Sequence, residues 1–175
     1  GYDIESTSYQ DNNGIYGSGL TCWSSHFIKK GANNDLGDQG QITIDSSTGQ
    51  LVSINRFNPV DKFGSSNDNS KPKITWEQAY SKSIDIVKKY FPDKVKDIDT
   101  KQTYIQRTEY YNNVPQFDRS YGFNFNRLVN GLSYQDDSIS INFNSATGEI
   151  TNIDIRWTQS LNVPSANGVI SKSDA

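Results

Sequence analysis

Apolar positions recur at helical spacing over residues 76–91, which predicts an α-helix with one apolar side. Pro92 ends this helix because proline has no amide hydrogen with which to continue it. Thr75 and Gln78 fit a capping box at the helix start, and Ile74 fits the apolar residue of a hydrophobic staple. The predicted apolar stripe consists of Trp76, Ala79, Tyr80, Ile84, Val87, Tyr90 and Phe91.

Downstream of the helix the apolar period changes to two, which is typical of strands with one buried and one exposed face. This alternation is clearest over residues 121–126, 139–143 and 153–157. Asn130-Gly131 predicts a tight hairpin, because both residues tolerate a positive φ. A weaker strand is expected over 103–110 and a loop over 111–115. The predicted fold is therefore α+β, with one amphipathic helix packed on an antiparallel meander sheet of about four strands.

Two segments of the chain repeat each other at an offset of 99 residues. Ile44–Ile54 and Phe143–Ile153 share four identical positions, and each contains Thr-Gly between two strand-like runs. We expect each Gly to supply the positive φ of a tight turn. A second repeat has an offset of 96, because residues 170–175 follow the plan of the helix start at 74–79.

The repeats divide the chain into four predicted parts. Residues 1–58 are the strand half of a first repeat, and 59–71 are a linker that contains a polar Gly/Ser/Asn run. Residues 72–158 are a complete repeat, and 159–175 are a linker with the start of a further repeat.

Composition and charge exclude several classes of function. The net charge is −3, and the basic stretch near the end of the predicted helix is interrupted by Asp93, so nucleic acid is not expected as a partner. No apolar run is long enough to span a bilayer. Because the chain begins with Gly1 and contains no Met, we expect a piece of a longer exported protein.

Nucleophilic and metal chemistry finds little support in the sequence. Cys22 and His26 are the only thiol and imidazole, and along a strand they would lie about 13 Å apart, beyond hydrogen-bond reach. One Cys with one His is too few ligands for zinc, and no nucleophile elbow or phosphate-binding loop is present. We expect no catalytic residues, no metal and no cofactor.

Carboxylates leave two minor alternatives open. Asp136-Asp137, with Asp118 and Glu109, could form the acidic pair of a hydrolase, although the two adjacent Asp fall in a predicted hairpin loop where Asp is common. Calcium could bind at residues 11–14 or at Asp136-Asp137, but neither segment matches an EF-hand loop.

Aromatic residues crowd a segment flanked by turn residues, and they form the candidate protein-binding patch. If exposed, such a cluster is the kind of apolar surface that protein partners use; otherwise it caps the core or is buried between repeats. The patch consists of Tyr110, Tyr111, Val114, Pro115 and Phe117.

The capped helix ending in Phe91-Pro92 resembles the opening of a YcdB/YcdC repeat, a relative of the PepSY domain. The residues 125–132, 137–141 and 147–150 and Trp157 continue the likeness, which covers 72–158 and, more loosely, 23–57. The first repeat departs from the pattern at residues 31–35, where the Asn-Gly turn is missing.

The resemblance implies a PepSY/cystatin-like fold and export to the cell envelope of a Gram-positive bacterium. It also implies a non-catalytic interaction module that restrains or chaperones a secreted protease or cell-wall hydrolase. The alternative is a structural spacer repeat with no ligand of its own, and a carboxylate-dependent hydrolase is the remote option. Exposure of the candidate patch would favour the interaction module, and burial between repeats would favour the spacer.

Overall fold

A computed structural model describes residues 1–11, 20–30, 38–57, 71–103, 109–111 and 114–162. In chain order the elements are β1 (Tyr2–Asp11), β2 (Thr21–Lys29), β3 (Gln39–Asp45), β4 (Leu51–Phe57), α1 (Trp76–Tyr90), the 3-10 turn η1 (Val95–Asp97), β5 (Glu109–Tyr111), β6 (Val114–Gln116), β7 (Ser120–Val129), β8 (Leu132–Asn144) and β9 (Ile150–Arg156).

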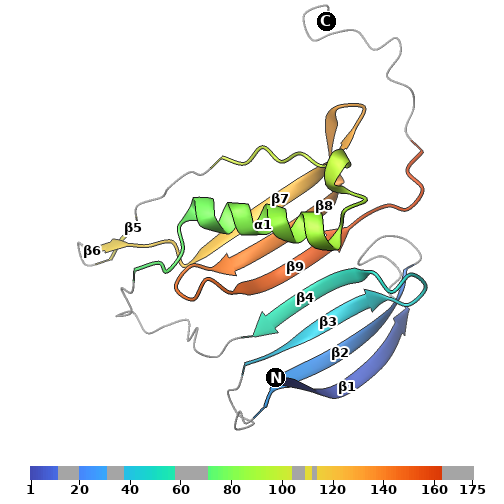
Figure 1. The fold of residues 1–175 in the computed structure, drawn as a ribbon, viewed down its shortest axis with the longest axis horizontal. Coiled ribbons are helices and arrows are strands. Elements are labelled where there is room, and N and C mark those ends of the chain that lie inside the picture. Colours follow the sequence, from blue (N-terminus) through green and yellow to red (C-terminus); the bar gives the residue numbers. More distant parts are fainter. Residues whose placement is uncertain (12–19, 31–37, 58–70, 104–108, 112–113, 163–175) are drawn as a thin grey trace, which may run out of the picture.

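Seven of the strands form one antiparallel sheet in the order β1-β2-β3-β4-β9-β8-β7. The predicted α+β class with a meander sheet is confirmed, and α1 lies across β7, β8 and β9 (Figure 1). The Asn130-Gly131 hairpin joins β7 to β8, with φ of 53° and 78°, as its residue types require.

The region before β7 differs from the prediction. A loop is expected over 111–115, yet Glu109–Tyr111 pairs with Val114–Gln116 in a separate two-stranded sheet. Pro115 favours the loop in the sequence, but an edge strand tolerates a proline because one of its sides needs no amide donor. The main sheet therefore receives three strands from this part of the chain instead of four.

The capping box at the start of α1 is confirmed. Thr75 Oγ1 accepts a hydrogen bond from the Gln78 backbone N–H at 3.3 Å, and Gln78 Oε1 accepts one from the Thr75 N–H at 2.9 Å. Tyr90 was predicted on the apolar stripe but is 56% exposed, with Lys89 Nζ 4.8 Å from its ring centroid. Phe91, the last residue of the predicted stripe, is buried as expected.

The core lies between α1 and the face of β7, β8 and β9 that α1 covers. The Trp76 and Tyr80 rings stack with their centroids 5.5 Å apart, and both rings pack against the Phe123 ring. The buried apolar residues of this core are Ile74, Ala79, Val87, Phe91, Ile98, Tyr121, Phe123, Phe125, Ile139, Ile141, Phe143, Ile153 and Ile155. Aromatic side chains thus supply much of the buried area, as their share of the sequence suggests.

The two Thr-Gly hairpins are built from the same hydrogen bonds. Asp45 Oδ1 accepts from the backbone N–H groups two and three residues ahead at 2.8 and 3.3 Å, and Asn144 Oδ1 does so at 2.8 and 3.0 Å. Gly49 and Gly148 have φ of 70° and 74°. The turn expected from the sequence repeat is therefore present in both copies.

The joint between the two halves of the sheet is symmetric. Ile54 of β4 pairs with Ile153 of β9, and these two residues are counterparts at the repeat offset of 99. Ser53 pairs with Asp154 and Asn55 with Asn152, so the pairing is the same when the halves are exchanged. An approximate twofold axis therefore passes through the Ile54–Ile153 pair, perpendicular to the sheet. The repeat boundaries drawn from the sequence stay a prediction.

Gly148 and Gly49 allow a matched test of this repeat. A Cβ at Gly148 would lie 2.9 Å from Cγ2 of Ile74, whereas at Gly49 it would meet no described atom within 4 Å. Gly49→Ala is expected to cost about 1 kcal/mol of unfolding free energy through its positive φ, and Gly148→Ala about 2–3 kcal/mol because Ile74 must also move. Urea denaturation of the two variants measures the difference, and equal losses would contradict this packing.

Candidate interaction surfaces

α1 covers only half of its side of the sheet, and no helix of the described chain lies over β1–β4 (Figure 1). The Ile54 side chain lies on the same side of the sheet as α1. Because side chains alternate along a strand and paired residues share a face, further apolar side chains of β2, β3 and β4 lie on this side, where α1 does not cover them. We define the open half-face as Trp23, Phe27, Ile42, Ile44 and Leu51. Trp23 is 44% exposed, and its ring meets that of Tyr9 edge-on at 5.1 Å.

β1 forms one edge of the sheet. Among the described residues it pairs only with β2, and the whole of Tyr2–Gln10 is exposed. At the opposite edge the chain partly covers β7, where the Asp99 N–H donates to the Asn126 carbonyl at 2.8 Å. β1 therefore presents a long row of backbone donors and acceptors to solvent.

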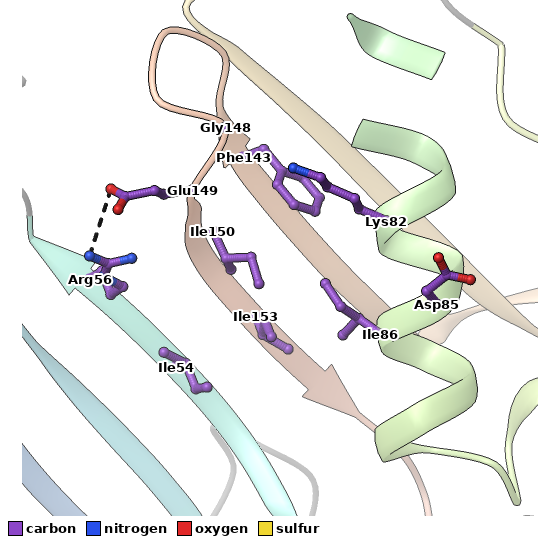
Figure 2. A pocket seen from close by; sticks show the side chains of 10 residues that line it. All are labelled: Ile54, Arg56, Lys82, Asp85, Ile86, Phe143, Gly148, Glu149, Ile150 and Ile153. Atoms are coloured by element: carbon purple, nitrogen blue, oxygen red, sulfur yellow. Dashed lines mark ion pairs between the residues drawn. The ribbon is translucent and has the colours of Figure 1, made fainter. Parts of the chain in front are cut away.

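A groove of about 540 Å³ runs between α1 and β4 (Figure 2). Its floor is apolar, and Lys82 and Asp85 of α1 stand on one rim with Arg56 and Glu149 on the other. The Arg56 guanidinium lies 3.7 Å from the Glu149 carboxylate. The apolar residues lining the groove are Ile54, Ile86, Phe143, Ile150 and Ile153.

Arg56 also ties β4 to the start of β3. Its Nη2 donates to Asp38 Oδ2 at 2.6 Å, and the Tyr2 hydroxyl donates to the same oxygen at 2.8 Å. Burial alone raises the pKa of the Asp38 carboxyl, but the hydrogen bonds from Arg56 and Tyr2 outweigh it and hold that pKa below its usual value. The bond to Asp38 raises the pKa of Tyr2.

Asp38→Asn is expected to cost about 1–2 kcal/mol of unfolding free energy at pH 7, because the Asp38 side chain is only 13% exposed and is charge-paired. A carboxyl whose folded pKa is depressed contributes stability above its unfolded pKa of 3.8, and this contribution is lost as pH falls through the folded pKa. The difference between wild type and variant should therefore shrink below about pH 4 in thermal melts. Asp3→Asn, at a surface ion pair, should change stability by less than about 0.5 kcal/mol.

The candidate patch falls largely outside what the structure describes. The backbone pairs Tyr110 with Pro115 and Tyr111 with Val114, but the side chains of these four residues lie outside the described part. Phe117 is 42% exposed. The patch therefore stays a prediction.

The candidate catalytic residues are not brought together where the structure describes them. Cys22 is buried on β2, and His26, four residues along the same strand, places Nδ1 2.9 Å from Glu5 Oε2. Among the described residues, no three His, Cys, Asp or Glu side chains are grouped for a metal. Of the proposed calcium segment 11–14, residues 12–14 lie outside the described part.

The prediction of a hairpin loop at Asp136-Asp137 is wrong. Both residues lie within β8, because Asn126 pairs with Ser138 while Arg127 pairs with Tyr134, which leaves 135–137 as a bulge. Asp137 is 2% exposed there and accepts a hydrogen bond from Arg127 Nη1 at 2.8 Å.

Asp137 is therefore a buried structural anion. Its other oxygen accepts from the Thr158 N–H at 3.0 Å and from the Thr158 hydroxyl at 2.8 Å. The Arg127 guanidinium lies 4.7 Å from the centroid of the Trp157 ring. Sequence reasoning missed this cluster, since a bulge that turns Asp137 inward leaves no signal in the apolar pattern.

Comparisons with known proteins agree with this fold. The family model described as the YcdB, YcdC repeated domain matches residues 1–157. A search of curated proteins finds no match. The C-terminal domain of Bacillus megaterium YpeB has a similar solved structure, with a TM-score of 0.60 and 12% sequence identity.

The match with the YpeB domain covers 99% of this chain and 64% of the other, so the chain spans less than two thirds of its structural neighbour. At this identity the likeness shows the fold alone. None of the described helices has the length and apolar character needed to cross a bilayer. The family match extends over most of the sequence and includes both Thr-Gly hairpins. The chain belongs to the family of YcdB/YcdC repeated domains.

Proposed function

We propose that the chain is a non-catalytic, extracytoplasmic protein-interaction module of PepSY/cystatin-like fold. Its partner is a secreted protease or cell-wall hydrolase of a Gram-positive envelope, which it restrains or chaperones. Membership of the YcdB/YcdC repeat family and the fold shared with the YpeB domain support an envelope role. The burial of Asp137 in an ion pair with Arg127 supports the non-catalytic assignment.

The observation that carries the proposal is the exposure of β1 at the edge of the sheet. A ten-residue edge strand that, within the described part of the chain, has no strand partner on one side is a template for an extended segment of another protein. Main-chain hydrogen bonds supply the affinity in such strand addition, and alternate side chains supply the specificity. The exposed Ile4 and Tyr9 side chains add apolar area beside that edge.

Capture of secreted and wall proteins on the immobilised chain tests this function. We expect an enriched partner, and we expect the double variant Ser6→Lys/Ser8→Lys to lose most of it, because lysines on an edge strand oppose strand addition. Ser133→Lys/Gln135→Lys, on exposed positions of β8, adds the same charge elsewhere and should retain the partner. Equal capture by both double variants would remove β1 from the proposal.

A structural spacer is the second candidate, and the β4–β9 joint favours it. Strands of two predicted repeats that share one continuous sheet make a unit suited to holding other parts of a protein apart. Recovery of no enriched partner at micromolar chain concentration would support the spacer. Alanine replacement of the candidate patch, Tyr110 to Phe117, tests the second surface in the same capture assay.

A further inference from the structure

The open half-face matches, pair for pair, the half of the sheet that α1 covers. Trp23 faces Ile44 across β2 and β3, and Ile44 faces Leu51 across β3 and β4. The covered half has the same register, in which Tyr121 faces Phe143 and Phe143 faces Ile150. Both halves also shift register at the same place in the repeat, between Thr43 and Ile44 and between Asn142 and Phe143. The uncovered face is thus built on the plan of a helix-covered one.

Burial differs sharply between counterparts. Trp23 is 44% exposed, whereas its counterpart Tyr121 is 7% exposed beneath α1. Ile141, at the centre of the covered half, is fully buried, while its counterpart Ile42 is only partly buried. The apolar side chains are present in both halves, whereas the helix of the described residues lies over only one of them.

The seat for a helix start is also present and open. On the covered half, Ile74 packs on Gly148, and the Lys73 N–H donates to the Ser145 carbonyl at 2.8 Å. The first hairpin offers the same turn at Gly49, over which no described atom would lie within 4 Å of an added Cβ. An apolar staple residue can therefore sit on Gly49 as Ile74 sits on Gly148.

The groove beside α1 has an apolar floor and charged residues on both rims. α1 presents Lys82 and Asp85 to it, one cation and one anion (Figure 2). The twofold axis through Ile54 and Ile153 would bring a second helix alongside, antiparallel to α1.

We propose that the open half-face seats a second amphipathic helix of the α1 type, joined ahead of Gly1 at the repeat spacing. The spacing follows from the strand pairing, because Tyr2 pairs with Lys29 as Ile98 pairs with Arg127. Tyr2 and Ile98 are 96 residues apart, which is the offset of the helix-start repeat. The proposal concerns a different face from the β1 edge, so it goes beyond the proposed function.

Fusing a copy of residues 71–96 directly to Gly1 of the whole chain tests the proposal, because this junction reproduces the repeat spacing. We expect the melting temperature to rise by at least about 5 °C, since several apolar side chains leave water. The methyl signals of Ile42 and Ile44 and the indole signal of Trp23 should shift in NMR spectra. In the fusion, Gly49→Ala should lower the free energy of unfolding by as much as Gly148→Ala does in the unmodified chain.

The matched control carries Ala79→Asp and Val87→Asp in the added copy only, which breaks its apolar stripe and leaves the rest unchanged. No gain in melting temperature over this control, with unshifted Ile42 and Ile44 signals, would overturn the proposal. Analytical sedimentation of the unmodified chain tests whether a second copy of the chain covers the open half-face instead. A stable dimer that Trp23→Asp abolishes would assign the face to a second copy and would also overturn it.

Discussion

Phe125→Ala is expected to lower the free energy of unfolding by about 3–5 kcal/mol, one of the two largest effects that we predict for single substitutions. Phe125 is fully buried on β7, faces Ile139 across the sheet and lies under Tyr80 of α1, with ring centroids 6.4 Å apart. Its removal leaves a cavity between helix and sheet that neither rigid layer can close. Urea denaturation with far-UV circular dichroism measures the loss.

Leu132→Ala is the matched control, because Leu132 is 71% exposed at the tip of the β7–β8 hairpin. This variant should stay within about 0.5 kcal/mol of the wild type. If Phe125→Ala cost no more than Leu132→Ala, the packing of α1 on β7 and β8 would be wrong.

Asp137→Ala should lower the free energy of unfolding by about 2–4 kcal/mol, which is a large effect for an aspartate because most aspartates lie at the surface. The substitution leaves the Arg127 guanidinium, whose side chain is 19% exposed, without its 2.8 Å partner. It also removes the acceptor for the N–H and hydroxyl of Thr158. Chemical denaturation of the variant measures this loss. Because Thr158 follows β9, we also expect the backbone amides at the end of β9 to exchange hydrogen faster in the variant than in the wild type.

Asp136→Ala tests whether charge alone explains the effect. Asp136 is exposed and adjacent, so its removal changes the net charge equally and should leave stability within about 0.5 kcal/mol. Arg127→Met/Asp137→Leu removes both charges and should recover part of the loss, since apolar residues of similar size replace a buried ion pair well. No recovery would show that the bonds to Thr158, and not the ion pair, hold this region.

The sequence predicts those parts of the fold that local chemistry determines. Thr75 and Gln78 form the expected capping box, and Asn130-Gly131 forms the expected hairpin, because each depends on neighbouring residues only. The alternation of Tyr121, Phe123 and Phe125 likewise predicts the buried face of β7. Residues close in sequence are sufficient for each of these predictions.

Features that depend on distant pairing could not be predicted. The bulge that buries Asp137 arises from the register of β7 against β8, and neither strand reveals that register alone. The β4–β9 joint pairs residues 99 apart, which the repeat marks as counterparts but not as neighbours. The strand at Val114–Gln116 was missed because Pro115 is compatible with a strand only at an edge.

The symmetry of that joint limits how such units can be assembled. β4 is the last strand of the first half and β9 is the last strand of the second half, and the two pair with each other. Once they are paired, neither strand has a free edge at which a further half could be added. An interface of this kind closes on itself and does not extend into a ribbon. Copies of this repeat would therefore associate through β4–β9 as pairs, and a lone copy would leave an unprotected strand at its border. An expression fragment that cuts between residues 57 and 71 should for this reason aggregate more readily than the whole chain.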